Sequence, residues 1–148
     1  MKISFFGHHD YEPDEKDKDA IISKLIELDN DEPIEFLLGG IGAFDMFARR
    51  CCLKYKKINS KVNLTLVLPY LNRDYGIKGY DESVYPPLET VPQRLAIVKR
   101  NEWMVEQSDY IIAYVWHYGG ARKTFDFAKR KHKPIFNLAL RKYNDLKL

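Results

Sequence analysis

The sequence predicts a single α/β domain, built on a parallel sheet of about five strands with helices on both faces. Short apolar runs alternate along the chain with longer segments whose apolar residues recur at helical spacing. The runs are almost continuously apolar, as in strands that are covered on both faces. The length of 148 residues, with 45% hydrophobic and 30% charged residues, fits one globular domain.

Each predicted strand is an apolar run that ends at a glycine, a proline or a polar turn. Gly7 ends the first run, and Pro69 stops the third because proline cannot continue a ladder of hydrogen bonds. The second run passes directly into a glycine cluster. The predicted strands, in chain order, are Lys2–Phe6, Ile34–Leu38, Val62–Leu68, Tyr110–Val115 and Pro134–Leu138.

The predicted helices are segments with apolar residues three and four positions apart. Asp14 is placed to cap the first helix, and Pro92 is placed to open the third, where proline is favoured. The predicted helices cover, in order, about residues 15–28, 44–58, 92–107 and 124–131. This alternation of strands and helices indicates one Rossmann-like domain over residues 1–148, with a polar tail from about residue 141.

The segment from Tyr70 to Thr90 is predicted to be irregular. Irregular segments of this length are uncommon in small domains and usually serve as lids or binding loops. A disordered insertion is the alternative, but the segment is rich in tyrosine, leucine and valine, which disfavours disorder.

Composition excludes several classes of protein and partner. The first residues carry one basic side chain and an apolar stretch shorter than a secretory signal, and no apolar run approaches the ~20 residues of a membrane span. We therefore expect a cytoplasmic protein without a membrane partner. The net charge of +3 is too small to indicate nucleic acid, which we expect to be an unlikely partner. Cys51 and Cys52 are adjacent, which suits neither a disulfide nor a zinc site, so we expect packing residues and no metal or cofactor.

Glycines follow three of the predicted strands. They are Gly7 after the first, Gly39, Gly40 and Gly42 after the second, and Gly119 and Gly120 after the fourth. In an open parallel sheet, ligands bind beyond the carboxyl ends of the strands. Glycine permits a close approach of the backbone, and a following helix offers free N–H groups to an anion. The pattern predicts a phosphate or nucleotide site, although neither a dinucleotide fingerprint nor a Walker A motif is present.

Charged side chains accompany these glycines. Asp45 begins the second helix, while Arg122 and Lys123 follow the last glycine pair, where they supply cations or form a solvated turn. Arginine on the third helix would bind a phosphate in bidentate fashion. His8 and His9 follow the first strand, but loop histidines are more often polar surface than catalytic groups.

Several motifs resemble those of the SLOG superfamily. The string from Arg100 to Met104, then Ser108–Tyr114 and Gly119-Gly120, is similar to the pattern of the Lonely Guy nucleotide phosphoribohydrolases. Small standalone SLOG proteins of the YpsA/YoqJ type, found in Firmicutes and their phages, match more of the chain. The strings that carry this second resemblance are Gly7-His8-His9, Gly39–Asp45, Leu66–Tyr70, Val84–Pro86 and Arg100–Gly120.

The resemblance implies a Rossmann-like domain that binds nucleotides or nucleotide-derived ligands. In the hydrolases of the superfamily, an arginine and a glutamate perform the chemistry, and Arg100 holds the arginine position. Asp126 stands in the carboxylate position but is one methylene shorter, and Arg122 and Lys123 replace the phosphate-loop glycine and threonine. A displacement of about 1 Å can cost ~10²-fold in rate, so these departures weaken the case for catalysis.

Three functions follow from these observations. The first is a sensor or sequestering module for a nucleotide or an ADP-ribose-like molecule, and the second is an N-glycosidic hydrolase with Arg100 and Asp126 as catalytic residues. The third is a nucleic-acid accessory protein, because the DNA-processing protein DprA uses a related fold. Related proteins commonly dimerise, so we expect a homo-oligomer. The residues expected to bind the ligand are Gly7, His8, Gly39, Gly40, Gly42, Phe44, Asp45, Asn101, Gly119, Gly120, Ala121, Arg122, Lys123 and Thr124.

Overall fold

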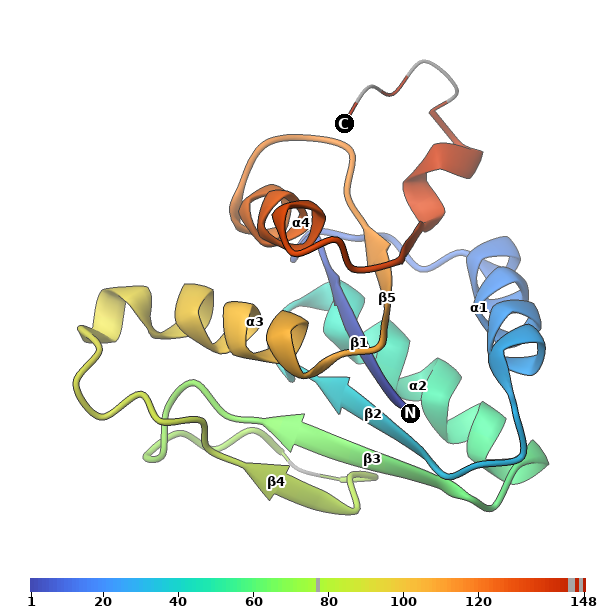
Figure 1. Ribbon diagram of the computed structural model, residues 1–148, viewed down its shortest axis with the longest axis horizontal. Helices are drawn as coiled ribbons and strands as arrows, with labels where there is room; N and C mark the ends of the chain where they lie inside the picture. The colour runs from blue at the N-terminus through green and yellow to red at the C-terminus, as the bar shows by residue number, and fades with distance from the viewer. Residues whose placement is uncertain (77, 144–145, 147) are drawn as a thin grey trace.

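Six parallel strands form one sheet in the order β4-β3-β2-β1-β5-β6 (Figure 1). The computed structural model describes residues 1–148 apart from 77, 144–145 and 147, so part of the expected polar tail lies outside the described residues. The strands are β1 (Lys2–Gly7), β2 (Ile34–Leu38), β3 (Val62–Val67), β4 (Glu82–Val84), β5 (Tyr110–Tyr114) and β6 (Ile135–Asn137). The predicted α/β class is confirmed, with one strand more than the five expected.

In the described part of the chain, four α-helices connect the strands, and two of them begin several residues away from the predicted positions. They are α1 (Glu15–Leu28), α2 (Ala43–Ile58), α3 (Ala96–Gln107) and α4 (Gly120–Arg130). The Asp14 side chain accepts a hydrogen bond from the Lys16 N–H, as expected of a cap. A 3₁₀ turn at Gln93–Leu95 precedes α3, so this helix begins later than predicted. None of the helices in the described ranges is long and apolar enough to cross a membrane.

Alternating side chains of the strands divide the core into two layers. On β1, Ile3 and Phe5 pack with the apolar faces of α1 and α2, whereas Phe6 packs with α3 and α4. On β5, Ile112 belongs to the first layer and Ile111 to the second. Both faces of the central strands are therefore covered, which explains why their sequences lack a polar alternation.

The chain changes direction across the sheet between β1 and β5. Strands β1 to β4 extend one way from the centre, and β5 then pairs with the free side of β1 through the register Ile3↔Tyr110 to Gly7↔Tyr114. Such a reversal opens a crevice at the carboxyl ends of the two strands, because the connections leave on opposite sides. The topology places the segments after Gly7 and Tyr114 at the two walls of that crevice.

The segment from Tyr70 to Thr90 is not entirely irregular, because it contains β4. This strand pairs with β3 through Thr65↔Glu82 to Val67↔Val84. The Tyr75 hydroxyl donates to the Tyr70 carbonyl, and Leu88 is buried. The segment forms an edge of the sheet with its own packing, and its role as a lid stays a prediction.

Cys51 and Cys52 are free and buried on the inner face of α2. Burial raises the pKa of Cys51 to about 12 and that of Cys52 well above its usual value. Both thiols act as apolar packing groups, as predicted.

Candidate functional site

A cavity of about 260 Å³ opens at the carboxyl ends of β1 and β5, where the chain changes direction. Eight residues singled out in the sequence line it: Gly7, His8, Asp45, Arg100, Asn101, Gly119, Gly120 and Ala121. They come from the ends of β1 and β5 and from the first turns or inner faces of α2, α3 and α4. The fold thus gathers residues that are more than one hundred positions apart, and we call this space the crevice cavity.

Arg100 is the central charged group of the crevice cavity. Its side chain is only 2% exposed, and Nη1 donates to the carbonyl oxygens of Gly39 at 2.7 Å and Val67 at 2.6 Å. Nε donates to Oδ1 of Asn101 at 2.8 Å. Nη2 takes part in no hydrogen bond between described residues. Arg100 therefore ties the ends of β2 and β3 together and keeps one nitrogen available to a ligand.

Asp45 and Arg100 both lie beside the space that a side chain on Gly39 would occupy. A Cβ built on Gly39 would stand 2.7 Å from Oδ2 of Asp45 and 3.0 Å from Nη2 of Arg100, so this position requires glycine. Burial raises the pKa of Asp45 to about 6, although the nearby Arg100 and a hydrogen bond from the Ile41 N–H favour its ionised form. No ion pair within 4 Å joins Asp45 to Arg100 in the described chain.

The helices α2 and α4 present different N-termini to the crevice cavity. The carboxylate of Asp45 already accepts from the backbone just before α2, so an anion there would meet a negative charge. At α4, neither Gly119 nor Gly120 has an atom within 4 Å of an added Cβ, and no side chain caps the helix. The first-turn N–H groups of α4 therefore open into free space, where the helix dipole favours an anion.

His8 fixes the loop between β5 and α4. Its Nε2 accepts from the backbone N–H of Trp116 at 3.0 Å and of His117 at 3.4 Å, and its ring stacks on that of His117 at 3.6 Å. Burial and the neighbouring His117 lower the pKa of His8 to about 4. His8 is therefore neutral at physiological pH, with its acceptor committed to the protein. It positions the cavity wall.

Three of the predicted ligand-binding residues lie below the cavity and serve the fold. Phe44 is fully buried, and its ring lies where a Cβ on Gly7 would stand. Gly40 has a φ of 71°, and Gly42 precedes α2 with a φ of 96°. Side chains rarely adopt these backbone angles, so both glycines form the turn that brings Asp45 into place.

Helix α4 begins at Gly120, four residues before the predicted start. The residues from Arg122 to Asp126 are therefore helical and point in different directions around the helix. Arg122 pairs with Asp126 through Nε and Oδ1 at 3.0 Å. Lys123, Thr124 and Asp126 line a separate cavity of about 280 Å³ between α3 and α4. Asp126 lies about one and a half helical turns after Gly120, outside the crevice cavity. The structure therefore does not bring Asp126 together with Arg100.

The predicted set lacked six residues that line the crevice cavity, namely Phe6, His9, Ile41, Ile97, His117 and Tyr118. Tyr118 and His117 lie in the loop directly after β5, and Ile97 lies on α3. The two loop residues could have been predicted from the sequence, because they directly follow the end of a predicted strand. Ile97 precedes Arg100 by three residues, a spacing that places both on one face of a helix.

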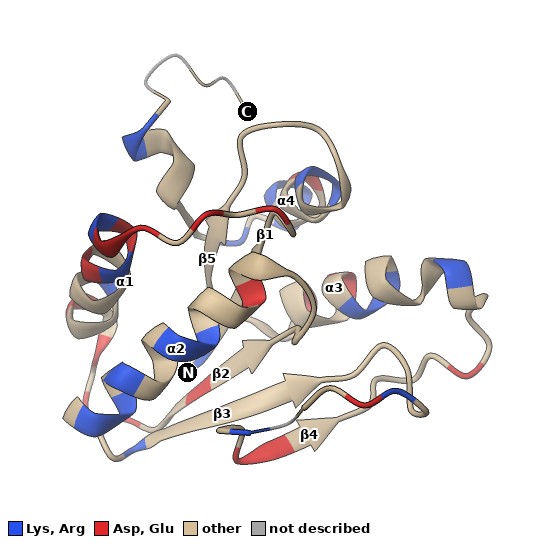
Figure 2. Cartoon of the chain, turned by 180° about the vertical axis from the view of Figure 1, so that it is seen from behind, with Lys and Arg blue, Asp and Glu red and all other residues tan. Residues whose placement is uncertain are grey.

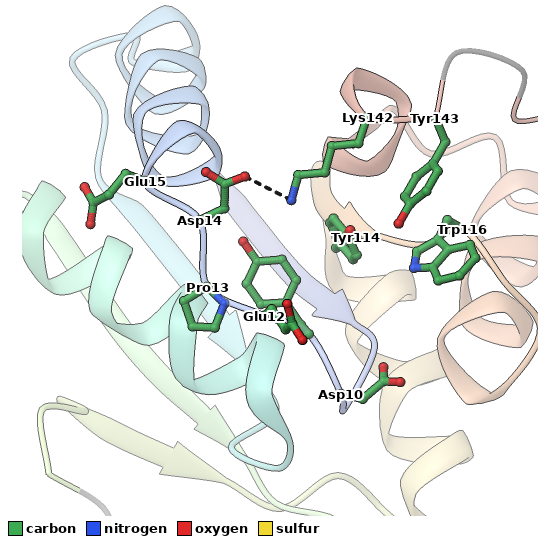
Figure 3. Close-up of a pocket in the computed structure, with 10 residues that line it drawn as sticks. Asp10, Glu12, Pro13, Asp14, Glu15, Tyr114, Trp116, Lys142 and Tyr143 are labelled. Atoms are coloured by element: carbon green, nitrogen blue, oxygen red, sulfur yellow. Dashed lines mark ion pairs between the residues drawn. The ribbon is translucent and has the colours of Figure 1, made fainter.

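A larger cavity of about 650 Å³ lies between α1 and the segment after β6 (Figure 3). Its walls carry the carboxylates of Asp10, Glu12, Asp14 and Glu15. Lys142 extends into it and pairs with Asp14 at 3.3 Å, and the Trp116 ring stacks on Tyr143. The excess of carboxylates disfavours a phosphate there, so the crevice cavity is the better candidate for an anionic ligand.

Comparison with solved structures identifies similarity in fold to a known protein. No protein-family model and no curated protein sequence matches the chain. Among solved structures, the chain is similar to DNA processing protein A from Helicobacter pylori, described for its single-stranded DNA binding mode, with a TM-score of 0.62 and 18% identity. The match covers 93% of this chain and 64% of that chain. It confirms the Rossmann-like fold, whereas membership of the YpsA/YoqJ group stays a prediction.

The comparison corrects one expectation drawn from the sequence. Nucleic acid was expected to be an unlikely partner because the net charge is only +3. That inference is wrong, since this fold occurs in a protein that binds single-stranded DNA. Net charge averages over the whole surface and does not report how charges are grouped on one face.

Proposed function

We propose that this protein binds a nucleotide or a nucleotide-derived ligand, with a phosphate group held in the crevice cavity. The single observation that carries the proposal is the buried guanidinium of Arg100, which has no ion pair within 4 Å among the described residues and leaves Nη2 without a partner. A buried charge of this kind is costly unless it is complemented, and a phosphate would complement it.

Two features support a position for the phosphate between Arg100 and α4. The first turn of α4 is uncapped and opens into the same cavity, so its N–H groups can donate to phosphate oxygens. Tyr118 lines the opening and is 82% exposed, which leaves its ring available to stack on a base. The cavity of about 260 Å³ is small for a whole nucleotide, so the base would extend past Tyr118.

Binding is favoured over hydrolysis. The hydrolase hypothesis needs a carboxylate beside Arg100, but Asp126 faces another cavity and pairs with Arg122. Asp45 is near, but no ion pair within 4 Å joins its carboxylate to Arg100 among the described residues, and that carboxylate already accepts a hydrogen bond from the Ile41 N–H. We therefore assign Arg100 a binding role.

Single-stranded nucleic acid is the second candidate ligand. The fold match to a protein described for single-stranded DNA binding favours it. For this ligand, the crevice cavity would hold one phosphate of the strand, bound by the same residues that would bind the phosphate of a free nucleotide.

Calorimetric titration with AMP, ADP-ribose and adenosine tests the proposal. AMP or ADP-ribose should bind at least tenfold more tightly than adenosine, because only the first two carry phosphate. The Gly120→Val variant places methyl groups in the open part of the cavity and should weaken AMP binding about tenfold, whereas Lys54→Ala on α2 should leave it unchanged. Equal affinities for AMP and adenosine, or no binding at millimolar concentration, would contradict the proposal.

A further inference from the structure

We propose that the exposed face of α4 binds the phosphate backbone of a single-stranded nucleic acid whose terminal or flipped nucleotide occupies the crevice cavity. This inference rests on the second candidate function above and names the surface that a longer strand would follow. We call this surface the α4 basic face. It comprises Arg122, Lys123, Lys129 and Arg130 of the helix and Lys131, which follows its last turn.

The α4 basic face follows from the spacing of charges along the helix. Lys123 and Arg130 are seven residues apart, which places them on one side of the helix, and Asp126 lies between them. Phe125 and Ala128 occupy the opposite side and are buried against the sheet. Asp126 is the one acidic residue between 122 and 133. In Figure 2 the ribbon of α4 carries more blue, for lysine and arginine, than red, for aspartate and glutamate.

Two cations of the face, Lys123 and Arg130, form no ion pair within 4 Å among the described residues, and they line the small cavity between α3 and α4 together with Glu102 and Asp126. The side chains of Lys123 and Arg130 are exposed, and they take part in no ion pair or hydrogen bond between described residues. Arg122, by contrast, is engaged with Asp126. Free lysine and arginine heads on one face bind phosphates and release the counterions of the nucleic acid.

Aromatic rings accompany these cations and favour a single strand over a duplex. Arg130 and Lys131 lie 5.8 and 5.4 Å from the centre of the half-buried Phe127 ring, and Arg122 lies 5.1 Å from that of the exposed Tyr118. Unpaired bases stack on such rings and on arginine, whereas the bases of a duplex are already stacked on each other.

The direction of the strand follows from the charges on either side of the crevice cavity. Helix α4 begins at the cavity with Gly120 and extends about 16 Å from it. On the other side lies the larger cavity, whose walls carry Asp10 and Glu12 and would repel a phosphate backbone. A strand anchored at the crevice cavity is therefore attracted along α4.

The test compares two double variants that remove the same charges from opposite faces. Lys123→Ala with Arg130→Ala acts on the α4 basic face. Arg50→Ala with Lys54→Ala is the matched control, because both residues are exposed on α2, which covers the other face of the sheet. Fluorescence anisotropy with labelled dT20 and rU20 is measured from 50 to 300 mM NaCl, with a duplex of the same length as competitor.

The expected result is an affinity for dT20 that falls about tenfold in the α4 variant and less than twofold in the control. The slope of log affinity against log salt should become less negative by roughly 1.4 for two lost phosphate contacts. Similar values for rU20 would show that the backbone is recognised irrespective of the sugar, and a preference for dT20 would restrict the partner to DNA.

Three outcomes would overturn the inference: no binding of either oligonucleotide, an equal loss in both double variants, or competition by the duplex as effective as by the single strand. AMP titration separates these outcomes from the proposed function, because the α4 variant leaves the crevice cavity intact. Unchanged AMP binding with an unaltered dT20 slope rejects only the α4 basic face. Absent AMP binding with an altered slope rejects only the nucleotide proposal.

Discussion

The carboxylate of Asp45 and the guanidinium of Arg100 both lie beside the empty space that a side chain on Gly39 would occupy. The glycine is the spacer of this arrangement, since a Cβ there would be 2.7 Å from the first group and 3.0 Å from the second. The separation keeps both charges from forming a closed ion pair. It thereby leaves Arg100 able to meet a charge that arrives from outside.

Replacement of Gly39 by alanine should destabilise the fold. The added Cβ forces a shift of two buried charged side chains, and overpacking of this kind costs roughly 1–3 kcal/mol. Urea unfolding of Gly39→Ala measures the loss. Gly120→Ala is the control and should change stability by less than about 1 kcal/mol, because its Cβ meets nothing within 4 Å. Equal stability of the two variants would contradict the spacer role.

Replacement of Asp45 by asparagine should stabilise the protein at neutral pH and have no such effect in acid. The pKa of Asp45 is raised to about 6 by burial, so its favourable contribution is present below the unfolded value of 3.8 and is lost as pH rises through 6. The stability difference between Asp45→Asn and the wild type should grow by roughly 2–3 kcal/mol between pH 3.5 and pH 7. A difference that does not vary with pH would refute this assignment.

His8 should cause the opposite dependence on pH. Its pKa is lowered from 6.5 to about 4, so the folded state resists protonation, and stability is complete above 6.5 and declines as pH falls toward 4. Protonation removes the acceptor that holds the N–H groups of Trp116 and His117. Between pH 7 and pH 4, the free energy of unfolding of the His8→Gln variant should fall by roughly 3 kcal/mol less than that of the wild type. If the stability of both proteins varied with pH in the same way, His8 would not be the cause of the loss of stability in acid.

Replacement of Arg100 by methionine should destabilise the fold as well as abolish ligand binding. The change leaves the carbonyls of Gly39 and Val67 without their donor, at about 1–3 kcal/mol each. Chemical unfolding should therefore show a loss of roughly 2–4 kcal/mol. Arg94→Met is the matched control, because Arg94 is exposed before α3 and should change stability by less than about 0.5 kcal/mol. An equally large loss of stability in Arg94→Met would contradict the claim that the buried hydrogen bonds of Arg100 cause the loss in Arg100→Met.

The strands of the central sheet were predictable because burial on both faces leaves continuous apolar runs. Strand β4 was not, since Glu82–Val84 is short and its only strand partner is β3 at the sheet edge. The start of α4 was also missed, because glycines ordinarily mark a turn and Gly120 here begins a helix.

The candidate site was predictable in its location and less so in its members. The carboxyl edge of the sheet follows from topology, and Gly7 and Gly119 were found there by position, whereas Arg100 was singled out by the resemblance to the hydrolases. The separation of Asp126 from Arg100 depends on where α4 begins, which sequence pattern defines only to within a turn. The burial of Arg100 depends on carbonyls from β2 and β3, contacts that no local pattern records.

The low reactivity of Cys51 and Cys52 makes the protein suitable for site-selective labelling and spectroscopy. With pKa values raised by burial, neither thiol forms appreciable thiolate at neutral pH, and maleimide reagents react with thiolate. A single cysteine introduced at an exposed position such as Tyr118 would take up a dye or spin label while the native pair stays unmodified. The motion of the crevice rim can thus be followed in a protein whose core is otherwise unaltered.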